Sequence, residues 1–147
     1  MNYVYKLTHE RTLETELEND EKICDIKLLG FFTTDENCKK MIPLYLKQPG
    51  FKVFPDDFVV EKVEADIDDF NEVLGDFKSS VFYLSHEWHD GRYDHVSSLG
   101  YYSSKKNAQK AMMFYQMSAD FHEHIDGFCI DEYEIDKCEW AEGFFSY

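Results

Sequence analysis

Leu99–Phe144, LGYYSSKKNAQKAMMFYQMSADFHEHIDGFCIDEYEIDKCEWAEGF, decides the fold because the chain contains this stretch twice. The earlier copy, Leu29–Leu74, reads LGFFTTDENCKKMIPLYLKQPGFKVFPDDFVVEKVEADIDDFNEVL and aligns with it without a gap. Eleven of the 46 aligned positions are identical, whereas unrelated segments of ordinary composition would share about three. The chain is therefore built from two diverged copies of one unit.

The repeat also extends upstream, with a different spacing. Tyr3–Glu10 matches Ser80–Glu87 at an offset of 77 residues instead of 70, so the first copy carries a longer loop. That loop, Arg11–Lys22, reads RTLETELENDEK and is strongly acidic. A longer loop on a repeated scaffold is a common place for function, and the alternative is a solvated hairpin tip.

Residue periodicity predicts the same elements in each copy. Alternation of side chains predicts two strands, followed by a helix with apolar residues at i, i+3, i+4 and i+7, and then a third strand. The predicted strands are 2–9, 23–33 and 58–65 in the first copy, and 80–87, 94–103 and 128–135 in the second. Gly30 and Gly100 fall inside strands, which indicates a bulge or a close backbone approach.

The start and end of each helix also have sequence signals. Thr33 and Glu36 have the spacing of a capping box, and Ser103 or Ser104 can cap the second helix. Pro43 lies inside the first helix and is expected to kink or shorten it.

These elements predict an α+β fold made of two pseudo-symmetric ββαβ repeats, with a mostly antiparallel sheet and the helices on one face. We expect one compact domain over residues 1–147, with repeat 1 at about 1–76 and repeat 2 at about 77–147.

Charge restricts the partners. The chain has 30 acidic and 15 basic residues and a net charge of −15. Nucleic-acid binding needs a basic surface, and so does attraction to anionic membranes, so neither is expected. A field of this sign attracts basic proteins. The chain has no apolar run of membrane-spanning length and no signal-peptide pattern at its N-terminus, which predicts a cytoplasmic protein.

Reactive residues show no catalytic pattern. His86, Glu87 and His89 do not have the HExxH spacing, and His9 and His86 are predicted to be hydrogen-bonded histidines at strand ends. His122–His124 is predicted to be a solvated loop. The four cysteines form no CxxC pair, which favours reduced thiols over a zinc site or disulfides. No nucleophile elbow, phosphate loop or dinucleotide motif is present, so we predict no enzyme activity, catalytic residue, metal or cofactor.

Acidic residues alternate with aromatic ones in two stretches, Glu87–Asp94 and Asp131–Glu142. Aromatic side chains supply binding energy in protein interfaces, and carboxylates supply steering and register. The alternative is that the aromatics face the core and the acids face water. With the acidic loop, these stretches give the predicted partner-binding residues: Glu14, Glu16, Glu18, Asp20, Glu87, Trp88, Asp90, Tyr93, Asp94, Asp131, Glu132, Glu134, Asp136, Glu139, Trp140 and Glu142.

Several motifs resemble a family of small bacterial domains of uncharacterised function. In the second copy they are Tyr83–Glu87, Leu99–Ser104, Gly127–Asp136 and Trp140–Phe144, and in the first copy Pro49–Phe51 and Phe54–Phe58. The resemblance implies a fold and no catalytic residues. By its small size, acidity and lack of a catalytic site, the chain also resembles immunity proteins of bacterial toxin–immunity pairs, including contact-dependent growth inhibition systems.

The leading hypothesis is an acidic immunity or inhibitor protein that binds and occludes a basic toxin, such as a nuclease domain. A second hypothesis is a nucleic-acid mimic that acts on a DNA- or RNA-binding protein, which an even line of carboxylates would favour. A third is a small metal-dependent enzyme that uses a cluster of histidines. The sequence also leaves a homodimer open.

Overall fold

The computed structural model describes residues 2–13, 23–66 and 75–139. Within these ranges the chain forms two three-stranded antiparallel sheets, one from each repeat. The first repeat contains β1 (Tyr3–Leu13), β2 (Ile23–Phe32), α1 (Asp35–Tyr45), a 3₁₀ helix (Phe51–Val53) and β3 (Phe58–Glu64). The second contains β4 (Ser80–His89), β5 (Asp94–Tyr102), α2 (Lys105–Gln116), a 3₁₀ helix (His122–Gly127) and β6 (Phe128–Glu134). The predicted α+β fold of two ββαβ halves is confirmed.

The chain divides into two compact units whose boundaries differ from those of the repeats. The β1 unit comprises Val4–Lys62 and Ile135–Tyr147, and the β4 unit comprises Met1–Tyr3 and Val63–Glu134. Each unit therefore contains the strands and helix of one repeat and the segment that follows the last strand of the other repeat.

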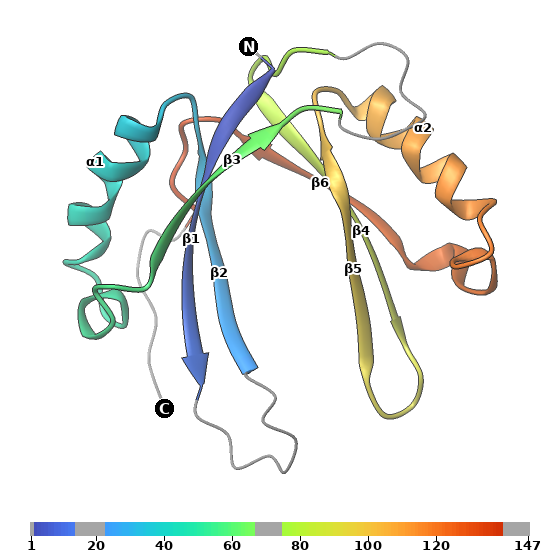
Figure 1. Cartoon of the computed structure of the whole chain (residues 1–147), viewed down its shortest axis with the longest axis horizontal. Coiled ribbons are helices and arrows are strands. Elements are labelled where there is room, and N and C mark those ends of the chain that lie inside the picture. The colour runs from blue at the N-terminus through green and yellow to red at the C-terminus, as the bar shows by residue number, and fades with distance from the viewer. Residues whose placement is uncertain (1, 14–22, 67–74, 140–147) are drawn as a thin grey trace. The chain divides into compact units, whose positions relative to one another are not determined.

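Each unit has its own apolar core between its helix and one face of its sheet. The sheets have the strand orders β2-β1-β3 and β5-β4-β6, and Figure 1 shows α1 over the first sheet and α2 over the second. Repeat-equivalent residues fill the cores: Leu7, Phe32 and Cys38 in the β1 unit and Leu84, Tyr102 and Ala108 in the β4 unit. No described helix is long and apolar enough to cross a membrane.

The glycines inside strands mark bulges, as predicted. Leu7 pairs with Gly30 and the next residue, Thr8, pairs with Leu28, so Leu29 is the extra residue. The register of β4 and β5 shifts in the same way at Gly100. Both glycines have positive φ, +156° and +144°, a conformation that side chains rarely adopt.

The helix caps correct one sequence expectation. Thr34, not Thr33, caps α1 by accepting from the backbone N–H of Asn37 at 3.0 Å, and Ser104 accepts in the same way from Asn107. The capping-box prediction for Thr33 was wrong because α1 begins one residue later, which leaves the Thr33 hydroxyl for another partner. The helix also continues past Pro43 to Tyr45, and it is one residue shorter than α2.

The residues that follow β3 (65–66) and β6 (135–139) belong to the unit of the other repeat, and we call them the crossing segments. An aspartate holds the crossing segment in each unit. In the β1 unit, Asp136 accepts from the backbone N–H of Thr33 at 3.0 Å and from its hydroxyl at 3.3 Å, and the Asp136 N–H donates to Phe31 O at 2.7 Å. In the β4 unit, Asp66 accepts from the N–H of Ser103 at 3.0 Å and from its hydroxyl at 2.6 Å. The two aspartates are the only described non-glycine residues with positive φ, at +58° and +64°.

The described cysteines are free thiols, as predicted: Cys38, Cys129 and Cys138. Burial raises the pKa of the Cys38 thiol to about 12, and the negative charges of Asp35 and Asp136 contribute. Such a thiol is inert at neutral pH.

Candidate interaction site

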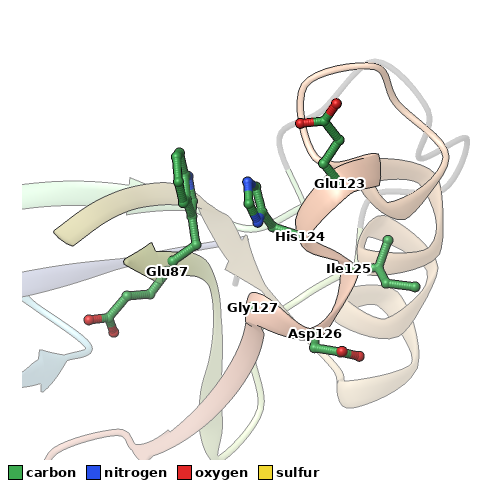
Figure 2. Close-up of a pocket in the computed structure, with 7 residues that line it drawn as sticks. Glu87, Glu123, His124, Ile125, Asp126 and Gly127 are labelled. Carbon is green, nitrogen blue, oxygen red and sulfur yellow. The ribbon is translucent and has the colours of Figure 1, made fainter. Parts of the chain in front are cut away.

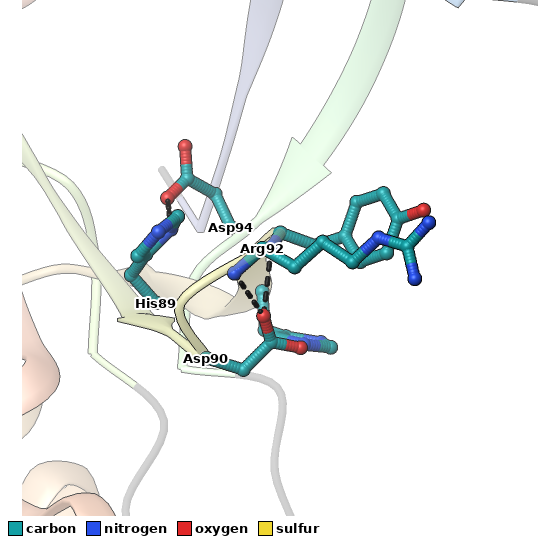
Figure 3. Close-up of polar contacts among 6 residues, drawn as sticks. His89, Asp90, Arg92 and Asp94 are labelled. Atoms are coloured by element: carbon teal, nitrogen blue, oxygen red, sulfur yellow. Dashed lines mark hydrogen bonds and ion pairs between the residues drawn. The ribbon is translucent and has the colours of Figure 1, made fainter.

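The tip of the β4–β5 hairpin brings together three of the predicted partner-binding residues: Asp90, Tyr93 and Asp94. One Asp90 carboxylate oxygen accepts from the backbone N–H groups of Arg92 at 2.8 Å and Tyr93 at 2.7 Å (Figure 3). Gly91 supplies the left-handed conformation that this turn needs, with φ +93°. The Asp90 side chain therefore fixes the turn. The sequence Asp-Gly suits this turn because the aspartate accepts from the following backbone N–H groups and the glycine adopts positive φ.

Two histidine–aspartate pairs continue this network at the base of the turn. His89 Nδ1 lies 2.7 Å from Asp94, and His95 Nε2 lies 2.8 Å from the second carboxylate oxygen of Asp90 (Figure 3). The hydrogen bond from His95, followed by those from Tyr93 and Arg92, lowers the pKa of Asp90 from 3.8 to about 2.

Asp90 should accordingly stay ionised at lower pH than an ordinary aspartate, because its pKa is about 2. A carboxylate with a depressed folded-state pKa stabilises the fold above its unfolded pKa, and this contribution disappears as the pH falls through the folded value. The stabilisation from Asp90 is therefore expected to fade between about pH 4 and pH 2. A carboxyl-carbon NMR titration should place the Asp90 midpoint near 2, and His95→Ala should raise it because the largest cause is removed. A midpoint near 3.8 in the unaltered chain would contradict this assignment.

Trp88 lies between two histidine rings. Its indole stacks on His95 at a centroid distance of 4.2 Å and an angle of 12°, and on His124 at 4.0 Å and 10°. The prediction that His122–His124 is a solvated loop was wrong for His124, which is half-buried inside the 3₁₀ turn His122–Gly127 that packs on β4. Local sequence gave no signal for this contact because the two residues are 36 positions apart.

A buried histidine holds that turn in place. His86 Nε2 lies 2.7 Å from the carbonyl oxygen of His124, and since a carbonyl only accepts, Nε2 carries the proton. In the β1 unit His9 Nε2 donates to the carbonyl of Phe54 at 2.9 Å, which is the equivalent bond. The predicted hydrogen bonds of His9 and His86 are confirmed, but both residues lie inside their strands and not at the ends, because β1 continues to Leu13 and β4 to His89. His86 also has a positioning role for His124.

A pocket of about 360 Å³ lies beside the stack. It is lined by Glu87, Trp88, Glu123, His124, Ile125, Asp126 and Gly127. Figure 2 shows the carboxylates of Glu87, Glu123 and Asp126 pointing in different directions and not into one centre. Among the described residues no group of three His, Cys, Asp or Glu side chains is placed to hold a metal ion. The pocket does not assemble a charged binding centre.

The sheet face opposite α2 gathers three of the predicted acids. Leu84 and His86 are buried on the helix side, so Glu87 projects from the other face by strand alternation. Its cross-strand partner is Val96, and Asp94 and Asp131 occupy the same face on β5 and β6 through their pairing with His89 and Tyr83. We call Glu87, His89, Asp94, Val96 and Asp131 the acidic sheet face.

The environment of Cys129 supports this placement. Cys129 lies on β6 between these acids, and its thiol contacts the Asp131 carboxylate at 3.6 Å. Burial, then the negative charge of Asp131 and a hydrogen bond to it, and then the charge of Glu87 raise the pKa of the thiol. Val96, opposite Glu87 on the edge strand β5, is 66% exposed. The face therefore combines carboxylates with an uncovered apolar side chain.

The C-terminal acidic stretch is divided between the two units. The Glu132 carboxylate accepts from the Ser80 hydroxyl at 2.9 Å, and Glu134 is exposed at the end of β6. Asp136 and Glu139 belong to the β1 unit, where the Asp136 carboxylate binds Thr33. The stretch is divided because the chain passes from one unit to the other at Ile135. The remaining predicted residues, Glu14, Glu16, Glu18, Asp20, Trp140 and Glu142, lie outside the described residues.

The β1 unit has the same scaffold with different side chains. Arg11 lies over the Phe54 ring at 4.7 Å, at the positions that Trp88 and His124 occupy in the second repeat. Glu10 pairs with Ile26, which is 60% exposed, as Glu87 pairs with Val96. The exposed pair is thus common to both repeats, whereas the Trp88 stack belongs to the second alone.

Comparison with protein families gives a match over the second repeat. Residues 80–144 match the profile of a domain of unknown function, DUF7336. These residues span the second repeat from the start of β4 to beyond the crossing at Ile135. No curated protein and no solved structure matches the chain significantly.

Proposed function

We propose that the chain is an acidic immunity or inhibitor protein that binds a basic toxin, and that the acidic sheet face is its docking surface. The observation that carries this proposal is the placement of Glu87, Asp94 and Asp131 on one face of three neighbouring strands, with exposed Val96 opposite Glu87 on the edge strand β5. A net charge of −15 adds long-range attraction for a basic partner.

The mechanism is occlusion. A nuclease binds the phosphate backbone through lysine and arginine side chains. Carboxylates at fixed spacing on a sheet can pair with those side chains and set the register of the complex, while Val96 and nearby Tyr93 supply apolar contact. The covered toxin would then be unable to reach nucleic acid. The proposal places this binding in the cytoplasm, where a nuclease toxin meets its substrate.

The rigid hairpin tip favours this role. Asp90 fixes the turn through two backbone hydrogen bonds, and His95 and His124 hold Trp88 between them. A surface that is already ordered loses less conformational entropy on binding, so more of the contact energy appears as affinity. Val96 and His89 also interrupt the carboxylates on this face, which favours a protein partner over mimicry of an evenly charged nucleic acid.

The proposal is tested by mixing the pure chain with basic nuclease toxin domains and measuring both nuclease activity and association rate at several salt concentrations. We expect inhibition at a 1:1 ratio and an association rate that falls as salt rises, because salt screens the attraction. The proposal fails if no basic toxin domain is inhibited, or if the chain binds one with a rate that does not depend on salt.

Charge reversal on the face should weaken such a complex. We expect Glu87→Lys with Asp131→Lys to reduce affinity by at least about tenfold, or ~1.4 kcal/mol, because it sets like charges against each other. Asp56→Lys with Glu64→Lys is the matched control, since both of these acids are exposed and the net charge changes equally. Equal losses from the two double variants would show that total charge, and not this face, governs binding.

A further inference from the structure

The crossing segments of the two repeats are chemically equivalent. Asp66 follows β3, Asp136 follows β6, and each is the second residue after its strand. Each accepts from the N–H and hydroxyl of the residue two positions before a helix, Ser103 or Thr33. Each aspartate also donates its backbone N–H to the carbonyl oxygen of an aromatic residue in the strand before that helix, Tyr101 at 2.9 Å or Phe31 at 2.7 Å.

The crossing segment of each unit packs where a strand ends and a helix begins, at β2 with α1 or at β5 with α2. We call this place the corner, and it is equivalent in the two units. The distance from the backbone N–H to the aspartate carboxylate is 3.0 Å in both units, although the two bonded residues are 103 positions apart in one unit and 37 in the other. Because donor and acceptor types coincide, either corner is suited to the segment of either repeat.

The segment after a repeat therefore completes a unit other than its own. Residues 80–144, which match DUF7336, include one repeat and its crossing segment and exclude the repeat on which that segment packs. In a chain with a single repeat, the crossing segment would have no second repeat on which to pack. The corner of that repeat would likewise have no crossing segment bound to it.

We propose that each corner is a docking site for the crossing segment of a second copy of the repeat, and that this chain is a segment-exchanged pair whose two copies are joined covalently. The recognised feature is an aspartate in left-handed conformation two residues after a β-strand, with its N–H bound to the receiving strand and its carboxylate bound ahead of the helix. The covalent connection between the repeats is then not needed to hold the pair together.

The test starts from the full chain with a protease site inserted after Glu72, a position outside the described residues. Native cysteines are replaced (Cys24, Cys129 and Cys138 by Ser, and Cys38 by Ala, its repeat equivalent). Cleavage gives two fragments, each with one repeat. We expect them to elute from size exclusion as one 1:1 complex with an unchanged circular dichroism spectrum.

Cysteine pairs show whether the segments are exchanged. Thr33→Cys with Asp136→Cys should join the two fragments by a disulfide on a non-reducing gel, as should Ser103→Cys with Asp66→Cys. The matched control is Thr33→Cys with Asp66→Cys, which lies within one fragment and should leave the fragments separate. A fragment-joining bond in neither exchanged pair, or separation of the fragments after cleavage, would overturn the proposal.

The same cleaved protein tests whether the corner accepts another copy. Ser103→Cys and Asp136→Cys are both on the second repeat, and in the intact chain these two positions bind Asp66 and Thr33 of the first repeat. After unfolding and refolding of the cleaved chain, second-repeat fragments that pair with each other should form a disulfide-linked homodimer. Absence of that homodimer while the mixed complex reforms would show that the corner is specific for the other repeat, and it would refute docking of a second identical copy.

Discussion

Replacing Asp66 by alanine should destabilise the chain by about 3 kcal/mol, the sum of a buried charged acceptor lost and donors left without a partner. Asp66 has no exposed surface, and its carboxylate accepts from the Ser103 N–H, the Ser103 hydroxyl and the Gly75 N–H at 2.6–3.0 Å. Alanine also tolerates a φ of +58° poorly. For a chain of this length such a loss lowers the unfolding temperature by roughly 6–12 °C.

The location of the effect is as informative as its size. Asp66 belongs to the first repeat by sequence and to the β4 unit by structure. Hydrogen exchange in Asp66→Ala should therefore accelerate in β5 and at the start of α2, before β1 and β2. Asp136→Ala is the matched control, with its carboxylate exposed and bound only to Thr33 in the described structure, and we expect about 1 kcal/mol. Faster exchange confined to β1 and β2 in Asp66→Ala would contradict the unit assignment.

Replacing Gly30 by alanine should cost about 2–3 kcal/mol, because positive φ and a steric clash act together. A Cβ at this position would lie 2.5 Å from the backbone oxygen of Lys137 and 3.0 Å from the Phe32 ring. Lys137 is part of the crossing segment, so relief of the clash requires that segment to move. The shift of the denaturation midpoint in urea measures the loss.

Gly100→Ala provides the matched comparison for Gly30→Ala. Its φ is +144°, and the nearest atoms to an added Cβ belong to the Tyr102 side chain at 3.1 Å or more. A side chain can move more easily than a backbone carbonyl, so we expect about 1 kcal/mol. A larger loss from Gly100→Ala than from Gly30→Ala would show that the Lys137 carbonyl does not lie against Gly30.

The sequence was sufficient to predict the parts of the fold that depend on local pattern. Alternation and the alignment of the copies identified the six described strands and the two α-helices but not the two 3₁₀ helices, and Gly30 and Gly100 identified the bulges. Their equivalent positions also led to His9 and His86. Asp66 and Asp136 occupy equivalent positions in the two copies, but no local pattern shows which unit a segment joins after its strand.

The candidate site was less predictable for the same reason. Glu87, Asp90 and Tyr93 are close in sequence and were expected together. The stack of Trp88 on His124 depends on how the turn before β6 packs on β4, which only the long-range bond from His86 determines. The C-terminal acids are consecutive in the sequence, and no local pattern shows that the crossing at Ile135 divides them between the two units.

The most direct measurement of the proposed function is a binding titration between this chain and the protein domain encoded immediately upstream of its own reading frame. We expect that domain to be a basic toxin and to form a 1:1 complex whose affinity falls with salt and by at least about tenfold on reversal of Glu87 and Asp131. Absence of binding to a basic toxin domain at that position, or a complex unaffected by both salt and the reversal, would contradict it.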